Sequence, residues 1–481
     1  MFRLSSVISA FICCFLTACV PSLQGGEPRA PNRYVPKNFG ASQSEASALG
    51  RKATSAAHKK CSEFFDSPEL RSLIETALRN NQELNLRMQE IVIAQNEVSA
   101  RRSEYFPKVN AQVGAGVEKV GKHTSQGTSD EAHELPEHLG DFSFGLAGSW
   151  EVDVWKKLRN AANAADLRYL ASMEARNFVA TQIIAEIARS YYELMAIDNQ
   201  LEILKRNIEI QASALEIVRL QKLAARVTEL AVQRFEAEVL KNRSRLYELE
   251  QERVQTENRI NFLVGRYPQR VKRNSHAFKE SVPGIIQTGL PSELLENRPD
   301  VRQAELELAA AKLDVAAAKA TFYPSLTIDA EVGYRSFNAE HLVATPASLI
   351  YRLAGNLVAP LLNRQAITAQ YRSANARQLQ AVFNFERTLL QAFTDVANQL
   401  ARVENLQKSY QLRSQQVETL IRSVEISNVL FQSARADYME VLLTRRDSLE
   451  AEMELVEIKK QQFHAMANVY QALGGGWRWG R

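Results

Sequence analysis

The sequence predicts a membrane β-barrel joined to a long α-helical coiled-coil barrel, with two internal repeats in each chain. Three observations lead to this prediction. Four short segments alternate apolar and polar residues, two very long stretches contain no Gly or Pro, and the elements recur in the same order.

Composition excludes several classes of protein before any element is assigned. The chain has 481 residues, 24% of them charged, and a net charge of only +4. Such a balance gives no electrostatic footprint for nucleic acid, so we expect no nucleic-acid partner. There is no Walker-type phosphate loop and no GxGxxG sequence after a strand. We therefore expect no nucleotide site.

Residues 1–18 have the pattern of a signal peptide. Arg3 precedes an apolar run from Val7 to Leu16, which is too short for a stable membrane anchor. The run leads into the sequence LTAC, which ends at Cys19 and resembles a bacterial lipobox. By that resemblance Cys19 is lipidated and becomes the first residue, and Val20 after it favours sorting to the outer membrane. The alternative is an ordinary signal peptide followed by a chance Cys.

Residues 19–66 are expected to form a lipidated N-terminal tether. Prolines and small residues dominate from Val20 to about Lys60, which prevents a regular helix. The alternative is a disordered linker without a docking surface. Cys13 and Cys14 leave with the signal peptide, so Cys61 is the one remaining thiol and no disulfide within the chain is expected.

Beyond the tether the sequence repeats itself. Residues 77–107 align with 294–324 at a shift of 217, and further along Arg226 aligns with Arg435 and Gly265 with Gly474 at a shift of 209. Each repeat is expected to contain a helix, a β-hairpin and a long helical hairpin. The domains would be a first repeat (67–265, with its β-hairpin at 107–155), an equatorial linker (266–297), a second repeat (298–474, with its β-hairpin at 324–361) and a C-terminal tail (475–481).

The stretches 156–264 and 363–473 predict long helices, because neither contains a Gly or Pro. Apolar residues recur at seven-residue spacing, which favours coiled-coil packing over an ordinary helix bundle. These series are Met173, Ala180, Ile187, Leu194, Leu201, Ile208 and Leu215, and Val382, Leu389, Val396, Val403, Tyr410, Val417, Val424 and Phe431.

Each long stretch is expected to fold back once, since a single straight helix would extend roughly 160 Å. We place the turns at 222–228 and 431–437. Thr228 followed by Glu229 predicts an N-cap, and Asp437 followed by Glu440 predicts a capping box. The first helix of each hairpin would then have about 65 residues, or on the order of 95 Å.

The four alternating segments fit transmembrane β-strands that are apolar toward lipid and polar toward a lumen. The alternative is a water-facing sheet on a helical core. Four strands cannot close a barrel, and open edges in hydrocarbon would leave backbone groups unsatisfied. Two chains would supply eight strands and three would supply twelve. The polar lumen positions favour three. The apolar positions are Val109, Ala111, Val113, Ala115 and Val117; Phe142, Phe144, Leu146, Trp150, Val152 and Val154; Leu326, Ile328, Ala330, Val332 and Tyr334; and Leu349, Tyr351, Leu353 and Leu357.

Three segments resemble motifs of the outer-membrane factors, the TolC and OprM family, and in particular its NodT-like lipoprotein branch, which serves resistance-nodulation-division (RND) pumps. They are LPSELLENRPDVRQAELELAAAKLDVAAAKATFYPSL (290–326), SWEVDVWKKLR (149–159) and ALGGGW (472–477). The resemblance covers essentially the whole mature chain. It implies a homotrimer with a twelve-stranded barrel in the outer membrane, a twelve-helix periplasmic tunnel, and a role as exit duct for drugs, metals or other solutes.

By this resemblance the turns at 222–228 and 431–437 form the periplasmic tip, which meets a periplasmic adaptor. Ala225 and Ala434 stand where the family often has Gly, and Ala231 and Leu443 stand where it often has acids. The aperture therefore cannot rely on those carboxylates. Our hypothesis is that opposite charges at the tip hold the duct shut until an adaptor competes for them. The alternative is that they are ordinary cap and surface residues. The candidate closing residues are Arg226, Glu229, Arg435, Asp437, Tyr438 and Glu440.

The predicted function is a passive efflux channel that depends on an inner-membrane pump, with no catalytic residues, cofactor or metal. The alternatives are the duct of a type I protein secretion system and a periplasmic adaptor lipoprotein. His123, His133 and His138 lie in the polar loop at 121–140, but their loose spacing favours a solvated loop over a metal site. The sequence does not identify the cargo.

Overall fold

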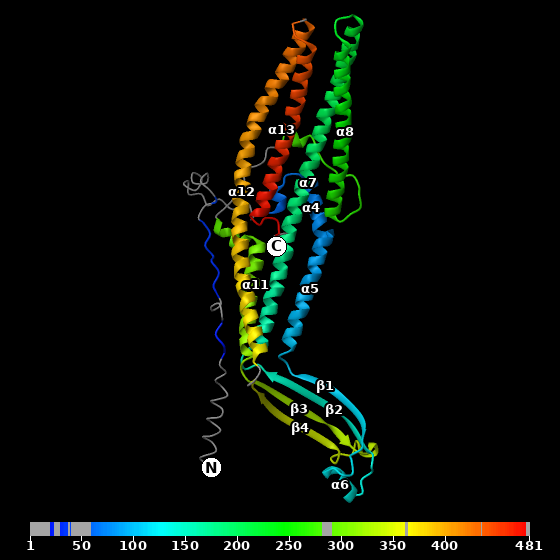
Figure 1. The fold of residues 1–481 in the computed structure, drawn as a ribbon, viewed down its shortest axis with the longest axis vertical. Helices are drawn as coiled ribbons and strands as arrows, with labels where there is room; N and C mark the ends of the chain where they lie inside the picture. Colours follow the sequence, from blue (N-terminus) through cyan, green and yellow to red (C-terminus); the bar gives the residue numbers. More distant parts are fainter. Residues whose placement is uncertain are drawn as a thin grey trace. The chain divides into compact units, whose positions relative to one another are not determined.

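The computed structural model describes residues 20–23, 29–36, 39, 59–280, 291–360, 364–433 and 435–477. Its elements follow one another in a repeated order (Figure 1). The first series consists of α3 (Cys61–Phe64), α4 (Pro68–Asn80), α5 (Gln82–Ser103), β1 (Lys108–Glu118), α6 (Ser125–Ala132), β2 (Leu139–Val152), α7 (Lys157–Leu223) and α8 (Glu229–Val264). The second series consists of α9 (Ala277–Glu280), η3 (Pro291–Glu293), α10 (Leu294–Asn297), α11 (Pro299–Ala320), β3 (Ser325–Ser336), η4 (Ala339–His341), β4 (Leu349–Val358), α12 (Gln365–Gln432) and α13 (Tyr438–Ala472).

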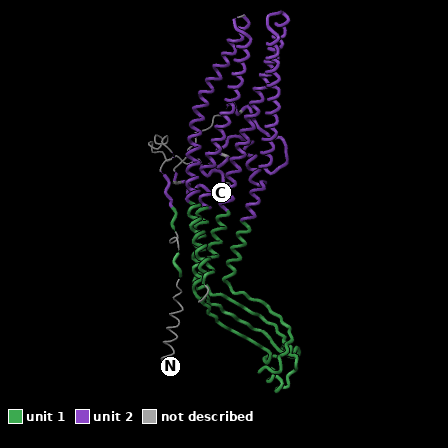
Figure 2. Tube along the Cα trace, viewed as in Figure 1, with its two compact units in different colours: residues 1–31, 91–172, 304–385 green, residues 32–90, 173–303, 386–481 purple. Residues whose placement is uncertain are grey.

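The chain divides into two compact units, and each unit draws on both series (Figure 2). The first unit includes Ile91–Ser172 and Ala304–Phe385, which hold the strands and the adjoining parts of the helices. The second unit includes Met173–Gln303 and Glu386–Arg481, which hold the helical hairpins. Each unit is therefore built from the matching parts of two repeats.

The four strands of the first unit form one antiparallel sheet in the order β1-β2-β3-β4. Ala111 of β1 pairs with Leu146 of β2, and Leu146 also pairs with Val332 of β3. This register places the apolar residues of neighbouring strands on one face, because side chains alternate along a strand. The outer strands β1 and β4 each have one neighbour, so the sheet has two open edges.

The two faces of the sheet differ in chemistry, as the alternation predicted. Large apolar side chains on one face are exposed in the single chain, with Val113 88%, Tyr351 83% and Leu353 78% exposed. On the other face, Asp329 accepts hydrogen bonds from Ser149 at 2.8 Å and from Asn356 at 2.7 Å. An apolar face this exposed requires a cover other than water.

The long helices α7 and α12 contain 67 and 68 residues, which confirms the expected length of about 65. Most of the residues predicted at seven-residue spacing are buried or half-buried. For example, Ile187 and Val396 have no exposed surface, whereas Met173 is 40% exposed. The heptad pattern therefore marks the packed side of each helix along most of its length.

The base of the helical hairpins contains a large buried core of the second unit. Tyr191, Tyr470 and Phe278 are each 1% exposed, and Cys61 is fully buried beside them. Two helix ends repeat the same close contact. An added Cβ at Gly265 would lie 2.4 Å from the carbonyl oxygen of Asn80, and one at Gly474 would lie 2.4 Å from that of Asn297. These pairs are the residues that the sequence alignment of the repeats had matched.

The described part of the tether packs against helices, so a linker without any docking surface is the wrong alternative for these residues. In the first unit Val20 and Leu23 pack against a cluster that contains Phe322 and Tyr371. In the second unit Phe39 stacks on Phe393, with ring centroids 5.4 Å apart. Cys19 and the signal peptide lie outside the described residues.

Candidate functional site

The end of the first helical hairpin lies between α7 and α8, at Ala224–Thr228. Ala225 has a left-handed backbone with φ +55. Its N–H donates to the Lys222 carbonyl at 2.9 Å, and the Arg226 N–H donates to the Gln221 carbonyl at 2.9 Å. These two bonds form a Schellman cap, which usually carries Gly at the left-handed position. Ala in that conformation costs roughly 1–2 kcal/mol.

The start of α8 lies where the sequence predicts it. Thr228 occupies the N-cap position with an extended backbone, but its side chain makes no capping hydrogen bond. The predicted N-cap residue and the acid in the first turn are therefore confirmed, although the usual capping hydrogen bond is not formed. Glu229, the first residue of α8, instead accepts a hydrogen bond from Gln233 at 2.8 Å and pairs with Lys222 across the turn. The bond from Gln233, followed by that from Lys222, lowers the pKa of the exposed Glu229 carboxyl.

The end of the second hairpin lies between α12 and α13. The Arg435 N–H donates to the Leu430 carbonyl at 2.8 Å, the same five-residue step as at Arg226. Ala434, the counterpart of Ala225, lies outside the described residues. Asp437 is the N-cap of α13, and its carboxylate accepts from the Tyr438 N–H at 2.6 Å. The bond goes to the first helical residue and not to Glu440, so the cap differs from the predicted capping box.

Apolar side chains join the two hairpin ends within one chain. Tyr438 and Leu442 of α13 pack against a buried cluster formed by α7 and α8. The guanidinium of Arg234 also lies 3.0 Å from the Met439 sulfur. The buried members of this cluster are Leu215, Val218, Ala231, Val232, Phe235 and Val239. Ala231, which stands where the family often has an acid, is thus part of the apolar core.

The six predicted closing residues lie at the two hairpin ends. Tyr438 is half-buried and the other five are exposed. Within the described chain no ion pair joins two members of this set, and Glu229 pairs with Lys222 instead. Sequence reasoning missed Lys222, although its seven-residue distance from Glu229 across a predicted turn was a usable signal. Leu443 is 40% exposed beside them. The six candidate closing residues are Arg226, Glu229, Arg435, Asp437, Tyr438 and Glu440.

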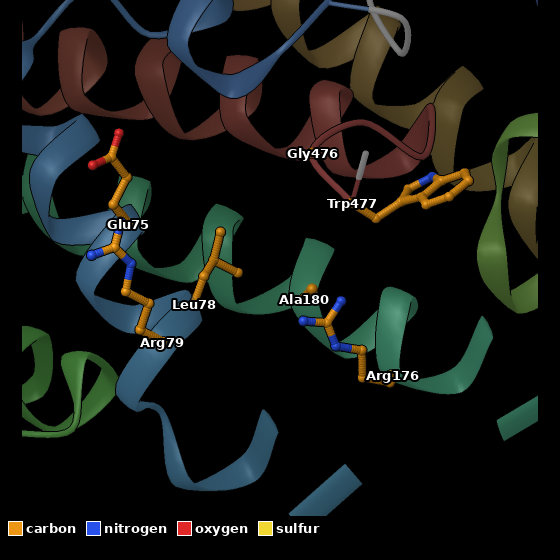
Figure 3. Close-up of a pocket in the computed structure, with 7 residues that line it drawn as sticks. All are labelled: Glu75, Leu78, Arg79, Arg176, Ala180, Gly476 and Trp477. Atoms are coloured by element: carbon orange, nitrogen blue, oxygen red, sulfur yellow. The ribbon is translucent and has the colours of Figure 1, made fainter. Parts of the chain in front are cut away.

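Among the described residues of the second unit, two cavities stand out away from the hairpin ends. One of about 120 Å³ is lined by α4, α7 and the C-terminal residues Gly476 and Trp477 (Figure 3). Arg79 and Arg176 line it, and the Trp477 indole N–H donates to the Asn297 carbonyl at 3.0 Å. The other, about 590 Å³, is a polar groove between α7, α8 and α13. Its lining mixes glutamates with arginine and lysine side chains, which suits a wall in contact with water.

No helix within the described ranges is long and apolar enough to cross a bilayer. Among the same residues there is no group of three or more His, Cys, Asp or Glu side chains placed to hold a metal ion. The loop that contains His123, His133 and His138 is among the described residues, and these three side chains do not form such a group.

Comparison with known proteins gives consistent matches along the chain. The family described as "Outer membrane efflux protein" matches residues 73–266 and 290–475. The "Pyoverdine export outer membrane protein OpmQ" of Pseudomonas aeruginosa is 29% identical over 475 residues, which cover 98% of this chain and 97% of that protein. The "Probable outer membrane lipoprotein SilC" of Salmonella typhimurium is 27% identical, with 99% of each chain covered.

A solved structure shows that the fold is shared as well. The open state of the Neisseria gonorrhoeae MtrE outer membrane channel superposes with a TM-score of 0.80 at 22% identity. The match covers 95% of this chain and 99% of that one. At this identity the likeness concerns the fold alone, and it extends over both units.

Proposed function

Since the chain belongs to the outer membrane efflux protein family and is an outer-membrane efflux channel, we propose that it works as a passive homotrimeric duct. Three copies would form a twelve-stranded barrel and a twelve-helix periplasmic tunnel. The duct would receive small molecules such as drugs or metals from an inner-membrane pump through a periplasmic adaptor. Cys19 would carry the lipid that anchors each copy in the outer membrane.

The observation that supports the trimer most directly is the sheet with two open edges and an exposed apolar face. An edge strand in hydrocarbon would leave its N–H and C=O groups without partners. Pairing β4 of one copy with β1 of the next would repeat the pairing of β2 with β3 within the chain. Three copies supply twelve strands, which leaves a wider interior than the side-chain-filled interior of an eight-stranded barrel.

The polar face of the sheet suits the wall of an aqueous lumen. Arg335 forms a two-point ion pair with Asp141, at 2.8 Å and 2.7 Å. Together with the bonded Asp329, this pair presents charge toward the barrel interior, where water remains available. A duct of this kind has no energy source of its own, so the pump must supply it.

We assign the closed state to contacts among the candidate tip residues of different copies. Replacing Arg435 and Glu440 with Ala should raise the open probability of single channels in planar lipid bilayers. The matched control is the pair Arg413→Ala and Glu454→Ala, an exposed ion pair between α12 and α13 away from the tip. Equal behaviour of both double variants would argue against a charged closure at the tip.

The trimer is tested with purified lipidated protein in detergent and after reconstitution. We expect a mass of three chains by analytical ultracentrifugation and discrete conductance steps in planar bilayers. A water-soluble monomer without conductance would contradict the duct. Accumulation of fluorescent drugs and of metal ions in a deletion strain, with and without the gene, then tests the cargo class. Loss of protein secretion with normal accumulation would favour the duct of a type I secretion system instead.

A further inference from the structure

Arg445 of α13, near the second hairpin end, is a charged side chain without a neighbouring counter-charge among the described residues. It is half-buried, and its Nη2 donates to the Asn428 carboxamide oxygen of α12 at 2.9 Å. Its Nε is buried and has no hydrogen-bond partner among the described residues. Burial lowers the pKa of the Arg445 guanidinium, and no neighbouring acid offsets this effect. A guanidinium stays charged, so burial without a counter-charge is unfavourable.

The first repeat contains the same contact in a balanced form. At the shift of 209 residues, Asn428 and Arg445 correspond to Arg219 and Glu236. Arg219 lies 3.4 Å from Glu236 and 2.8 Å from Glu216, so the first hairpin pairs its cation within the chain. In the second hairpin Arg445 replaces the acid Glu236, and Asn428 replaces the cation Arg219. One positive charge is therefore left over in the α12–α13 groove.

The corresponding groove of the first hairpin, between α7 and α8, is filled by side chains of α13. Tyr438 and Leu442 of α13 pack against the cluster in the α7–α8 groove that contains Val218 and Phe235. In a ring of alternating repeats, a head-to-tail contact recurs at every step, so α8 of the next copy should enter the α12–α13 groove. The counterparts of Tyr438 and Leu442 are Glu229 and Gln233.

The counterparts of the receiving residues complete the match. Val218 and Phe235 correspond to Ser427 and Thr444, which directly precede Asn428 and Arg445 in the chain. Glu229 of the incoming helix would thus arrive at the level of Arg445. Among the described residues of its own chain, Glu229 is exposed and contacts Lys222 and Gln233, and its carboxylate remains accessible.

We propose that the α12–α13 groove near the tip docks α8 of a second copy of this chain, with the second copy's Glu229 pairing with Arg445. This inference rests on the proposed trimer. Near the tip the contact between the hairpins of one chain consists mainly of apolar side chains, whereas the proposed contact between copies contains Glu229, Gln233, Ser427, Thr444 and Arg445. Polar contacts exchange readily with water. Opening of the tip would therefore break this polar contact between copies.

Disulfide trapping tests the contact in the full-length protein. Chains with Glu229→Cys are coexpressed with chains with Arg445→Cys and oxidised in isolated outer membranes. We expect a reducible dimer band that neither variant gives alone. The control replaces Arg445→Cys with Arg446→Cys, the next residue on α13, which is exposed and lies beside Asp447. A cross-link of equal yield with both partners would overturn the assignment.

Ultracentrifugation of the same preparations separates failure of this contact from failure of the duct. Trimers that do not cross-link would overturn the Arg445 contact and leave the trimer standing. Monomers would overturn both.

Charge exchange provides a functional readout. Arg445→Glu should raise the open probability about tenfold, because it places two acids opposite each other. Adding Glu229→Arg should restore the closed state. The matched variant Arg446→Glu carries the same change in charge, and Glu229→Arg should not rescue it. A failure of Glu229→Arg to reverse Arg445→Glu, in protein that still forms trimers, would overturn the proposal.

Discussion

The two ends of helix pair α7–α8 carry the same cap with different residues. At the hairpin end the left-handed residue is Ala225, with φ +55, and at the base it is Gly265, with φ +76. In both caps the N–H of the left-handed residue donates to the carbonyl three residues earlier. The N–H of the Arg that follows donates to the carbonyl five residues earlier. At the base a Cβ would meet the Asn80 carbonyl at 2.4 Å. Close packing therefore requires Gly at the base, whereas the hairpin end accommodates the Cβ of Ala.

Side chains show the same contrast within the second unit. The base buries Tyr191 and Tyr470 almost completely, whereas Leu220 and Leu223 near the hairpin end are 66% and 82% exposed. A buried aromatic core fixes the base as a rigid frame. The exposed leucines at the hairpin end need cover from neighbouring molecules, because an apolar surface in water is unfavourable. The difference indicates that mutations should affect folding at the base and gating at the tip.

The largest effect is expected at Tyr470. Its ring stacks on Phe64 at 4.1 Å and its hydroxyl donates to the Lys59 carbonyl at 2.9 Å. Tyr470→Ala should lower the free energy of unfolding by about 4 kcal/mol, through a cavity and a lost hydrogen bond. Tyr438→Ala, half-buried near the hairpin end, should lower it by only about 1 kcal/mol. Urea denaturation followed by circular dichroism measures both, and equal losses would contradict the contrast.

Acid should destabilise the base through His464. Its Nε2 lies 3.0 Å from the Arg189 carbonyl oxygen. Burial, followed by nearby Lys460, lowers its pKa from 6.5 to about 4. The folded state thus holds a neutral ring, while the unfolded state binds a proton below pH 6.5. Stability should be complete above pH 6.5 and fall by up to about 3 kcal/mol toward pH 4.

The control for this pH effect is His464→Gln, which removes the titrating ring. Its stability should vary less between pH 6.5 and pH 4 than that of the unchanged chain. A parallel decline in both proteins would assign the acid sensitivity to other groups.

A smaller loss is expected when the glycine at the base gains a methyl group. Gly265→Ala should destabilise the second unit by about 2 kcal/mol, because the new Cβ overlaps the Asn80 carbonyl. Gly474→Ala should behave alike, since its Cβ would lie 2.4 Å from the Asn297 carbonyl. Thermal unfolding monitored by circular dichroism compares the two. A neutral effect at both positions would show that the base adjusts more easily than its packing indicates.

Local patterns in the sequence predicted the elements of this fold well. Alternation identified the strands, and the absence of Gly and Pro identified α7 and α12, because both signals depend on nearby residues alone. The repeat also matched Gly265 with Gly474, although the reason, a neighbouring carbonyl, is a tertiary contact. Side-chain partners were harder to predict. The Lys222–Glu229 pair and the bond from Tyr438 to Asp437 depend on rotamers at the turns. The lack of a counter-charge at Arg445 could be recognised only by comparing the contacts in both hairpins.

The smallest effect is expected at the hairpin end itself. Ala225→Gly should raise the stability of the first hairpin by about 0.5–1 kcal/mol, since relief of the left-handed Ala exceeds the added entropy of the unfolded chain. Amide hydrogen exchange at residues 225 and 226, whose N–H groups donate the two bonds of the cap, measures this locally, and both should exchange more slowly than their intrinsic rates predict. Ala224→Gly is the matched control, because residue 224 does not have a positive φ. That change should speed exchange. Faster exchange in both variants would contradict the prediction. It would mean that the added flexibility of Gly outweighs the relief of backbone strain at residue 225.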